Sequence, residues 1–194
     1  MLHLSTVEST TLELLKKLQQ LPVLCNTRLV GGTALALQLG HRKSVDLDFF
    51  GQINVDSQDL KEALRTLGTL TILNDSKNIH IYVLNEVKID IVNYTYPWLD
   101  DVVYKDGIRL ASPRDIAAMK ITAIEGRGTK KDFVDIYFLL KNLLDFYSRK
   151  YPDSSSFMAM KSLAYFEDAE EEPMPYMLVD VSWDEIKKSI LSRL

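Results

Sequence analysis

Residues 29–50 read LVGGTALALQLGHRKSVDLDFF and decide how this chain folds. Residues 27–30 predict a short strand, and the strong helix formers over 33–39 end at Gly40, which suits a left-handed C-cap. Residues 45–50 then predict a second strand. A strand, a glycine turn, a helix and a further strand in this order predict an α/β (α+β) protein with a mixed sheet flanked by helices.

The glycine turn is a candidate phosphate site. Gly31 and Gly32 can bring backbone N–H groups close to an anion, and Thr33 adds a hydroxyl group where the helix dipole favours negative charge. A purely structural turn is the alternative, because glycine marks turns far more often than it binds ligands. Arg42 and Lys43 follow and either contact a triphosphate or form a solvated loop.

Two carboxylates alternate along the second predicted strand. Asp46 and Asp48 are two residues apart, so their side chains share one face while Leu47 points the other way. Mg²⁺ suits such a pair, since it takes oxygen ligands and keeps waters or substrate phosphate oxygens in its shell. The polar face of an exposed strand is the alternative, which the apolar Phe49 and Phe50 disfavour.

A third carboxylate lies on a later predicted strand. Asp90 occurs within residues 87–94, and the apolar residues around it share the opposite face. If this strand neighbours that of Asp46 and Asp48, the three carboxylates converge and could hold two metal ions. The alternative is an outward aspartate on an antiparallel strand.

Capping and turn signals predict the remaining elements. The N-terminal half has helices over 5–20, opened by the capping box Ser5-Thr6-Val7-Glu8, and over 56–67, with strands over 69–73, 79–84 and 87–94 and a hairpin turn at Asn85-Glu86. In the second half, Ser112-Pro113 predicts a helix to about 125, a break over 126–128, and a helical segment from about 130 to 140. Helices over 152–166 and after Ser182 flank a solvated acidic loop over 167–175. We therefore expect a core over 1–110 and a helical region over 111–194 packed on it.

The helical region carries charged candidates of its own. Lys120 lies in a helix that is apolar on almost every side, so it either faces a polar cleft or reaches solvent along its stem. Asp132 and Asp135 are three residues apart and share one face of the next helix. They could hold Lys120 or Arg127 in place, or act as carboxylates that the helix dipole favours.

The composition argues against several other kinds of protein. A net charge of -4 gives no overall basic surface, so contact with nucleic acid needs a local patch. One cysteine and three histidines offer no zinc cluster, and no Ser-His-Asp pattern is found. Without a signal pattern or an apolar run of spanning length, we expect a cytoplasmic protein that does not contact a membrane.

Together the motifs resemble the AbiEii/AbiGii toxin family of nucleotidyltransferase-like proteins. The resemblance covers roughly residues 25 to 145 and rests on 31–37, Arg42, Ser44, 46–49, Lys120, Arg127, Lys131, Asp132 and Asp135. It implies a DNA polymerase β-like nucleotidyltransferase fold, one or two Mg²⁺ ions, a nucleoside triphosphate (NTP) substrate and an acceptor, which is tRNA for some characterised relatives. It also implies a bacterial toxin of a toxin–antitoxin or phage-defence system, with a cognate antitoxin as partner.

The resemblance also implies a role for each matching position. Gly32 and Thr33 correspond to the family's glycine-plus-hydroxyl signature, and the further nucleotide-binding candidates are Gly31, Arg42, Lys43 and Arg127. The metal candidates are Asp46, Asp48 and Asp90, and the catalytic candidates are Asp46, Asp48, Lys120, and Asp132 or Asp135. The C-terminal region is shorter than that of larger members. A catalytically silent nucleotide- or partner-binding module on the same fold is the alternative.

Overall fold

The structure is built on one mixed β-sheet. The strands are β1 (Thr27–Val30), β2 (Leu47–Gly51), β3 (Leu70–Asp75), β4 (Ile79–Leu84), β5 (Val87–Asn93), β6 (Val103–Lys105) and β7 (Ile108–Leu110). In the computed structural model, which describes residues 1–139 and 142–194, their order in the sheet is β3-β4-β5-β2-β1-β7-β6. β2 pairs with β1 antiparallel and with β5 in parallel, so the sheet is mixed as predicted.

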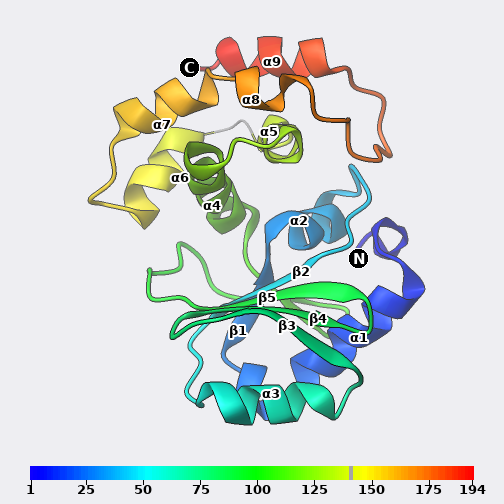
Figure 1. Cartoon of the computed structure of the whole chain (residues 1–194). Helices are drawn as coiled ribbons and strands as arrows, with labels where there is room; N and C mark the ends of the chain where they lie inside the picture. Colours follow the sequence, from blue (N-terminus) through cyan, green and yellow to red (C-terminus); the bar gives the residue numbers. More distant parts are fainter. Residues whose placement is uncertain (140–141) are drawn as a thin grey trace.

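Helices cover both faces of this sheet. They are α1 (Ser9–Gln20), α2 (Gly31–Leu39), α3 (Ser57–Arg65), α4 (Pro113–Gly126), α5 (Lys130–Tyr137), α6 (Leu143–Lys150), α7 (Ser156–Leu163), α8 (Glu167–Glu170) and α9 (Trp183–Leu191). Figure 1 shows α1 and α3 on one face, with α2 and the C-terminal helices on the other. Apolar residues of the central strands, such as Leu29, Phe49 and Ile89, are buried, whereas the edge strand β3 leaves Ile72 and Leu73 exposed.

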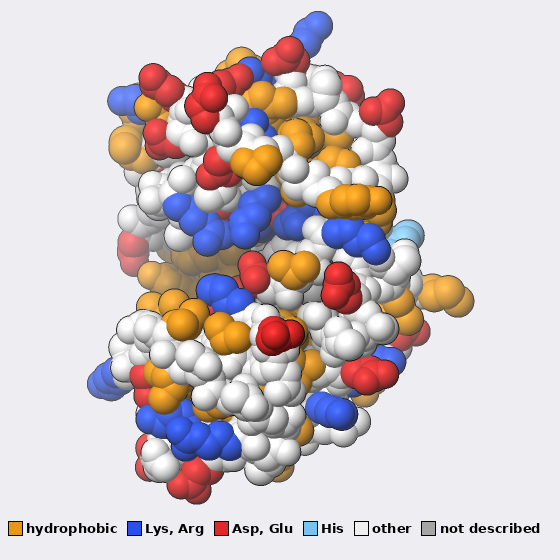
Figure 2. All heavy atoms as spheres, turned by 45° about the vertical axis from the view of Figure 1, so that its right-hand side comes forward, with side chains coloured by type: hydrophobic (Ala, Val, Ile, Leu, Met, Phe, Trp, Pro, Cys, Tyr) orange, Lys and Arg blue, Asp and Glu red, His pale blue; other side chains and the backbone are white. Residues whose placement is uncertain are grey.

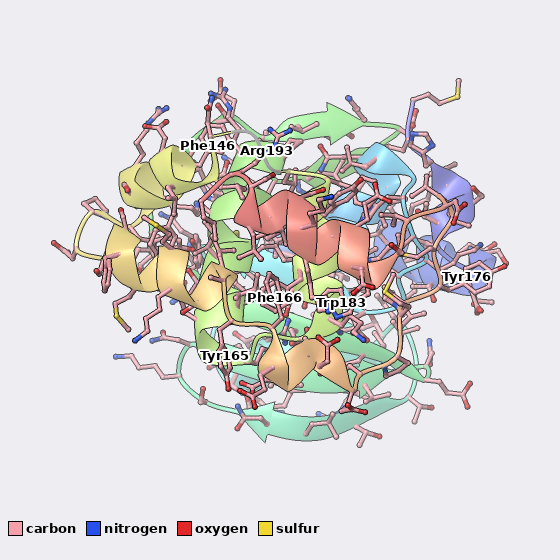
Figure 3. All side chains as sticks on the ribbon, turned by 90° about the horizontal axis from the view of Figure 1, so that it is seen from above. Phe146, Tyr165, Phe166, Tyr176, Trp183 and Arg193 are labelled. Atoms are coloured by element: carbon pink, nitrogen blue, oxygen red, sulfur yellow. The ribbon has the colours of Figure 1, made fainter. Side chains whose placement is uncertain are left out.

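The apolar core consists of two clusters that meet along α4. The first gathers buried side chains from Leu2 to Ile116 around the sheet, and the second gathers those from Ala117 to Ile190 among the helices. In the second cluster, the ring centroids of Phe166 and Trp183, both labelled in Figure 3, lie 5.8 Å apart. Helix α4 contributes to both clusters and so fixes the helical layer over the sheet.

Local turn and capping signals predicted several elements correctly. β1 has the predicted bounds, and Gly40 ends α2 in the left-handed conformation with φ of 73°. The hairpin residues Asn85 and Glu86 have φ of 50° and 68°, as a two-residue turn between twisted strands requires. Ser112 caps α4 by accepting a hydrogen bond from the backbone N–H of Asp115.

Other sequence predictions were wrong. The capping box at Ser5 does not open the first helix, which begins at Ser9 and is preceded by a 3₁₀ turn over Leu4–Thr6. The hairpin of β6 and β7, and helix α6, were not predicted. The region 152–166 is helical only over Ser156–Leu163, and the predicted loop 167–175 begins with α8. Leu140, the predicted end of the α5 segment, lies outside the described residues.

Candidate active site

A cavity of about 540 Å³ gathers most of the predicted site residues. It lies where the N-terminus of α2, the strands β2 and β5, and the helices α4 and α5 meet. Figure 2 shows a row of Lys and Arg side chains across the middle of this face of the molecule, with Asp or Glu side chains beneath it. The predicted residues that line it are Gly31, Gly32, Arg42, Lys43, Asp46, Asp48, Asp90, Lys120 and Arg127.

Asp48 and Asp90 form the centre of the site. They lie opposite each other in the parallel pair of β2 and β5, and both are half-buried. Burial, and then the negative charge of Asp90, raise the pKa of Asp48 to about 6. The Nζ of Lys88 lies 2.6 Å from Asp90 Oδ1 and offsets part of this repulsion. β5 runs parallel to β2 and antiparallel to β4, so Asp90 faces Asp48 across a parallel pair. Two facing carboxylates of this kind favour a bound cation.

Asp46 is less tightly held than Asp48. It precedes β2, which begins at Leu47, and not the predicted strand start at Val45. Its side chain is 36% exposed, and its Oδ2 lies 3.8 Å from the Nζ of Lys131. Asp46 therefore lies at the rim of the cavity, more exposed than a buried strand residue.

The two glycines are required by close contacts on either side. Gly31 has φ of +67°, and a Cβ at this position would lie 2.1 Å from Asp48 Oδ2. A Cβ at Gly32 would lie 2.1 Å from the Nη2 of Arg42. The two glycines therefore let the start of α2 lie against the carboxylate of Asp48 and the guanidinium of Arg42. A turn alone would not require glycine at both positions.

Thr33 has a different place from the one predicted. Its side chain is buried, and its hydroxyl group contacts the backbone oxygen of Asp46 and, at 2.8 Å, the hydroxyl of Ser44. The hydroxyl therefore fixes the segment over 44–46 against α2 and is engaged by protein atoms instead of facing the cavity. Thr33 positions Asp46 in this arrangement.

A buried charge network lies behind the cavity. The Nζ of Lys120 lies 2.8 Å from Asp132 Oδ1 and 2.6 Å from Asp135 Oδ2, and both carboxylates are fully buried. Arg42 binds Asp135 through Nε at 2.7 Å and Nη2 at 2.8 Å, and His41 Nε2 adds a contact at 2.8 Å. Both candidate aspartates therefore hold Lys120, and Asp135 holds Arg42 as well.

The pKa values in this network follow from opposite charges at short range. Burial alone would raise the pKa of Asp132, but Lys120, Thr129 and Arg127 bring it down to about 2. Burial is outweighed in the same way at Asp135, whose pKa Lys120 and Arg42 lower strongly. The two carboxylates in turn raise the pKa of Lys120 against its burial. All three groups are therefore charged at neutral pH.

The cations differ in how far they can reach a substrate. Arg42 is 4% exposed and is committed to Asp135, and Lys43 contacts the backbone oxygen of Ser5. The side chains of Arg127 and Lys131 are 58% and 45% exposed and line the cavity. Arg42 therefore supports the site from behind, while Arg127 and Lys131 face the open space.

Sequence reasoning assigned no role to three of the residues that line the cavity. Lys131 and Lys88 line the cavity. Lys131 is part of the family resemblance, whereas the only sequence signal of Lys88 is a charge two residues before Asp90. Tyr176 also lines the cavity, from the segment between α8 and α9, and appears at the edge of the molecule in Figure 3. The backbone of Tyr176 accepts a hydrogen bond from Lys43 N at 2.8 Å, a contact that no local pattern indicates.

The donor set fits Mg²⁺. Among residues 1–139 and 142–194, no three His, Cys, Asp or Glu side chains are grouped as a complete metal cage. Mg²⁺ does not need one, because it is commonly held by one or two carboxylates together with waters and substrate phosphates. The facing Asp48 and Asp90 give this cavity the oxygen donors that such an ion requires.

A family model described as "Nucleotidyl transferase AbiEii toxin, Type IV TA system" matches residues 13–188. The chain belongs to this AbiEii family. It is therefore a nucleotidyltransferase of a toxin–antitoxin family. An uncharacterized protein of Aquifex aeolicus (strain VF5) is 36% identical to this AbiEii protein over 187 residues, which are 91% of this chain and 90% of that protein.

Solved structures share the fold of this AbiEii protein. JHP933 from Helicobacter pylori superposes with a TM-score of 0.56 at 21% identity, covering 96% of this chain and 90% of that one. The nucleotidyltransferase toxin MenT4 from Mycobacterium tuberculosis gives a TM-score of 0.51 at 13% identity, covering 96% of this chain and 84% of that one. The predicted nucleotidyltransferase fold is confirmed. Within the described part of the chain, no helix combines the length and apolar character needed to cross a membrane.

Proposed function

We propose that this AbiEii protein transfers a nucleotide from an NTP to an acceptor hydroxyl group in a Mg²⁺-dependent reaction. One observation carries the proposal: Asp48 and Asp90 face each other across parallel strands, directly beside the glycine start of α2. The N-terminal N–H groups of α2 and the helix dipole favour phosphate oxygens at Gly31 and Gly32. Carboxylates and a phosphate cradle therefore adjoin, as nucleotidyl transfer requires.

Each side chain has a part in this reaction. Asp46, Asp48 and Asp90 would hold Mg²⁺, which when bound neutralises phosphate charge and activates the attacking oxygen. The acceptor hydroxyl oxygen forms a bond to the α-phosphorus and loses its proton to solvent, while the bond from the α-phosphorus to the bridging oxygen of pyrophosphate breaks and pyrophosphate leaves. Arg127 and Lys131 face the cavity as exposed cations and would stabilise the charge that develops on the leaving pyrophosphate. Lys120 fixes α5 against α4 through Asp132 and Asp135 and adds positive potential near Asp48.

We further propose an RNA acceptor, with tRNA as the specific candidate, and a cognate antitoxin as partner. The family description, which names a toxin–antitoxin system, supports the antitoxin. The RNA proposal is supported by the row of Lys and Arg side chains beside the cavity (Figure 2), since a chain with net charge -4 can meet RNA only through a local basic patch. Both proposals place the protein in the cytoplasm, where NTPs and tRNA occur together.

The test is a labelling reaction with matched variants. Full-length protein is incubated with Mg²⁺, each α-labelled NTP in turn and total bacterial RNA, and products are separated on a denaturing gel. Asp48→Asn removes a charge from the site without changing its size, and we expect at least a 100-fold loss of transfer, on the scale of a single electrostatic group. Asp101→Asn is the control, because Asp101 is exposed and does not line the cavity.

The outcomes separate the proposed enzyme from a silent module. Label on RNA with wild type and Asp101→Asn, and its loss with Asp48→Asn, supports transfer and names the base. Equal labelling by wild type and Asp48→Asn would remove Asp48 from the mechanism. Binding of an NTP without labelling of any acceptor would favour the silent nucleotide-binding module.

A further inference from the structure

A second cavity, of about 650 Å³, opens beside the active-site cavity. Its lining includes the rings of Phe50, Tyr94, Tyr96 and Tyr151, and we refer to it as the aromatic cavity. Arg127 lines both cavities, so they adjoin at that side chain. Figure 2 shows hydrophobic side chains in a hollow just below the row of Lys and Arg. An apolar, ring-lined space therefore begins where the charged cavity ends.

The alternation of the strands explains why the two cavities share one sheet face. Phe50 follows Asp48 by two residues on β2, so both side chains point to the same face, about 7 Å apart along the strand. Tyr94 follows Asp90 by four residues and continues the same face just beyond β5. The carboxylates are therefore followed along the sheet by aromatic rings, within the span of a ribose and its base.

Helix α4 supplies the opposite wall. Met119, Thr122, Ala123 and Gly126 recur at helical spacing and line the aromatic cavity, while Lys120 on the same helix lines the charged one. A Cβ added at Gly126 would meet no atom of the described chain within 4 Å, so this end of the wall is open. The space between strand and helix is therefore mostly apolar and open at the Gly126 end.

The rings of the aromatic cavity are partly fixed and partly free. The hydroxyl groups of Tyr94 and Tyr151 lie 2.8 Å apart, and the Phe50 and Tyr94 ring centroids are 5.4 Å apart. Tyr96 is 53% exposed, with its ring 4.9 Å from that of Tyr151. A fixed pair with an exposed third ring at its edge is an arrangement onto which a planar heterocycle can stack.

We propose that the aromatic cavity binds a nucleobase during nucleotidyl transfer, with Tyr96 as a stacking residue. The proposal rests on the proposed function, which places the phosphates at Gly31 and the α-phosphorus at Asp48. From the α-phosphorus at Asp48, the sugar and base of the NTP extend along the same face of β2 and reach Phe50 and Tyr96. Every nucleobase has a flat aromatic face, so stacking on these rings can hold any of the bases. Thr122 and Asp153, which also line the cavity, offer polar groups to the edge of the base.

The experiment measures binding with and without a base. Dissociation constants are determined for Mg²⁺ complexes of an NTP and of inorganic tripolyphosphate, and for a short RNA oligonucleotide without triphosphate. The full-length variants are Tyr96→Ala, which removes the exposed ring, and Ala123→Leu, which fills the cavity from α4. Tyr104→Ala on β6 is the matched control, since Tyr104 is 67% exposed and lies outside both cavities.

We expect Tyr96→Ala and Ala123→Leu to weaken NTP binding about tenfold while tripolyphosphate binding stays unchanged. If RNA binding is weakened and NTP binding is not, the nucleobase in the cavity is the acceptor's. Wild-type NTP binding that neither variant affects, with RNA binding also unchanged, would overturn the cavity assignment and leave the proposed function standing. Failure of wild type to bind either NTP or tripolyphosphate would instead refute the proposed function itself. Unfolding curves of both variants show whether a loss reflects misfolding.

Discussion

Gly31 joins the backbone geometry of α2 to the carboxylates of the site. Its φ of +67° lies in the left-handed region, where a side chain costs about 1 kcal/mol. A Cβ here would also meet Asp48 Oδ2 at 2.1 Å, so the cost of a side chain has a steric part in addition to the backbone part. These two parts can be separated by comparison with another glycine.

We predict that Gly31→Ala reduces nucleotidyl transfer at least tenfold, because Asp48 must move. Gly107→Ala is the control, since Gly107 has φ of +78° and a Cβ there meets nothing within 4 Å in the described structure. Both variants should lose about 1 kcal/mol of stability from backbone strain. Urea unfolding and the labelling assay, run side by side, check this. Equal activity of the two variants would show that the contact with Asp48 does not matter.

The residues of the site were predictable to the extent that their signals are local. Glycines before a helix and alternating aspartates are patterns within a few residues, and they identified Gly31 and Asp48. The partner of Arg42 is 93 positions away, at Asp135, and Tyr176 reaches the cavity from the far end of the chain. No spacing rule links such positions, so the reassignment of Arg42 from phosphate contact to buried support needed the structure.

The difference between local signals and long-range contacts also decides which helices and strands could be predicted. Turn and cap chemistry located β1, the end of α2, the β4–β5 hairpin and the start of α4. The β6–β7 hairpin was missed although Asp106-Gly107 is a hairpin signal, because strands of three residues carry almost no periodicity. β7 is held in the sheet by its parallel pairing with β1, where Leu29 lies opposite Leu110. Such pairing is a tertiary contact that the strand's own sequence does not encode.

Helix α5 makes the stability of the protein depend on pH. It carries Asp132 and Asp135, whose pKa values lie below the ordinary value near 4 for aspartate, at about 2 for Asp132. A carboxylate with a lowered pKa in the folded state contributes stability that is fully present above the unfolded pKa. That contribution is lost as the pH falls through the folded pKa.

We therefore predict that the free energy of unfolding decreases as the pH is lowered from about 4 to 2. Asp132→Asn should flatten this decrease by on the order of 2 kcal/mol while lowering stability at pH 7. Urea unfolding at several pH values measures both. Asp145→Asn is the control, because Asp145 is exposed and only weakly paired with Arg149. An unaltered pH profile in Asp132→Asn would contradict the assignment of the acid loss to α5.

On the scale of the whole molecule, a buried ion pair joins helices α4 and α6 and contacts the link between β5 and β6. Lys150 at the end of α6 and Asp115 at the start of α4 are both fully buried, with Nζ 2.7 Å from Oδ1. The Nζ also donates to the backbone oxygen of Pro97 and lies 4.5 Å from the ring centroid of Trp98. The link between β5 and β6 is thereby tied to two helices of the other layer.

Removing one partner of this buried pair should lower the free energy of unfolding more than removing one partner of an exposed ion pair. We predict that Lys150→Met destabilises the protein by about 3–5 kcal/mol, because Asp115 stays buried without its counter-charge. Arg149→Met, which removes a neighbouring exposed cation, should cost less than about 1 kcal/mol.

In the double variant Lys150→Met/Asp115→Asn, the loss should be smaller than the sum of the two single losses, since the uncompensated charge is gone. Urea unfolding of these variants and of Asp115→Asn measures this coupling, and a loss in Lys150→Met no larger than in Arg149→Met would show that the buried pair stabilises the protein no more than a surface pair does.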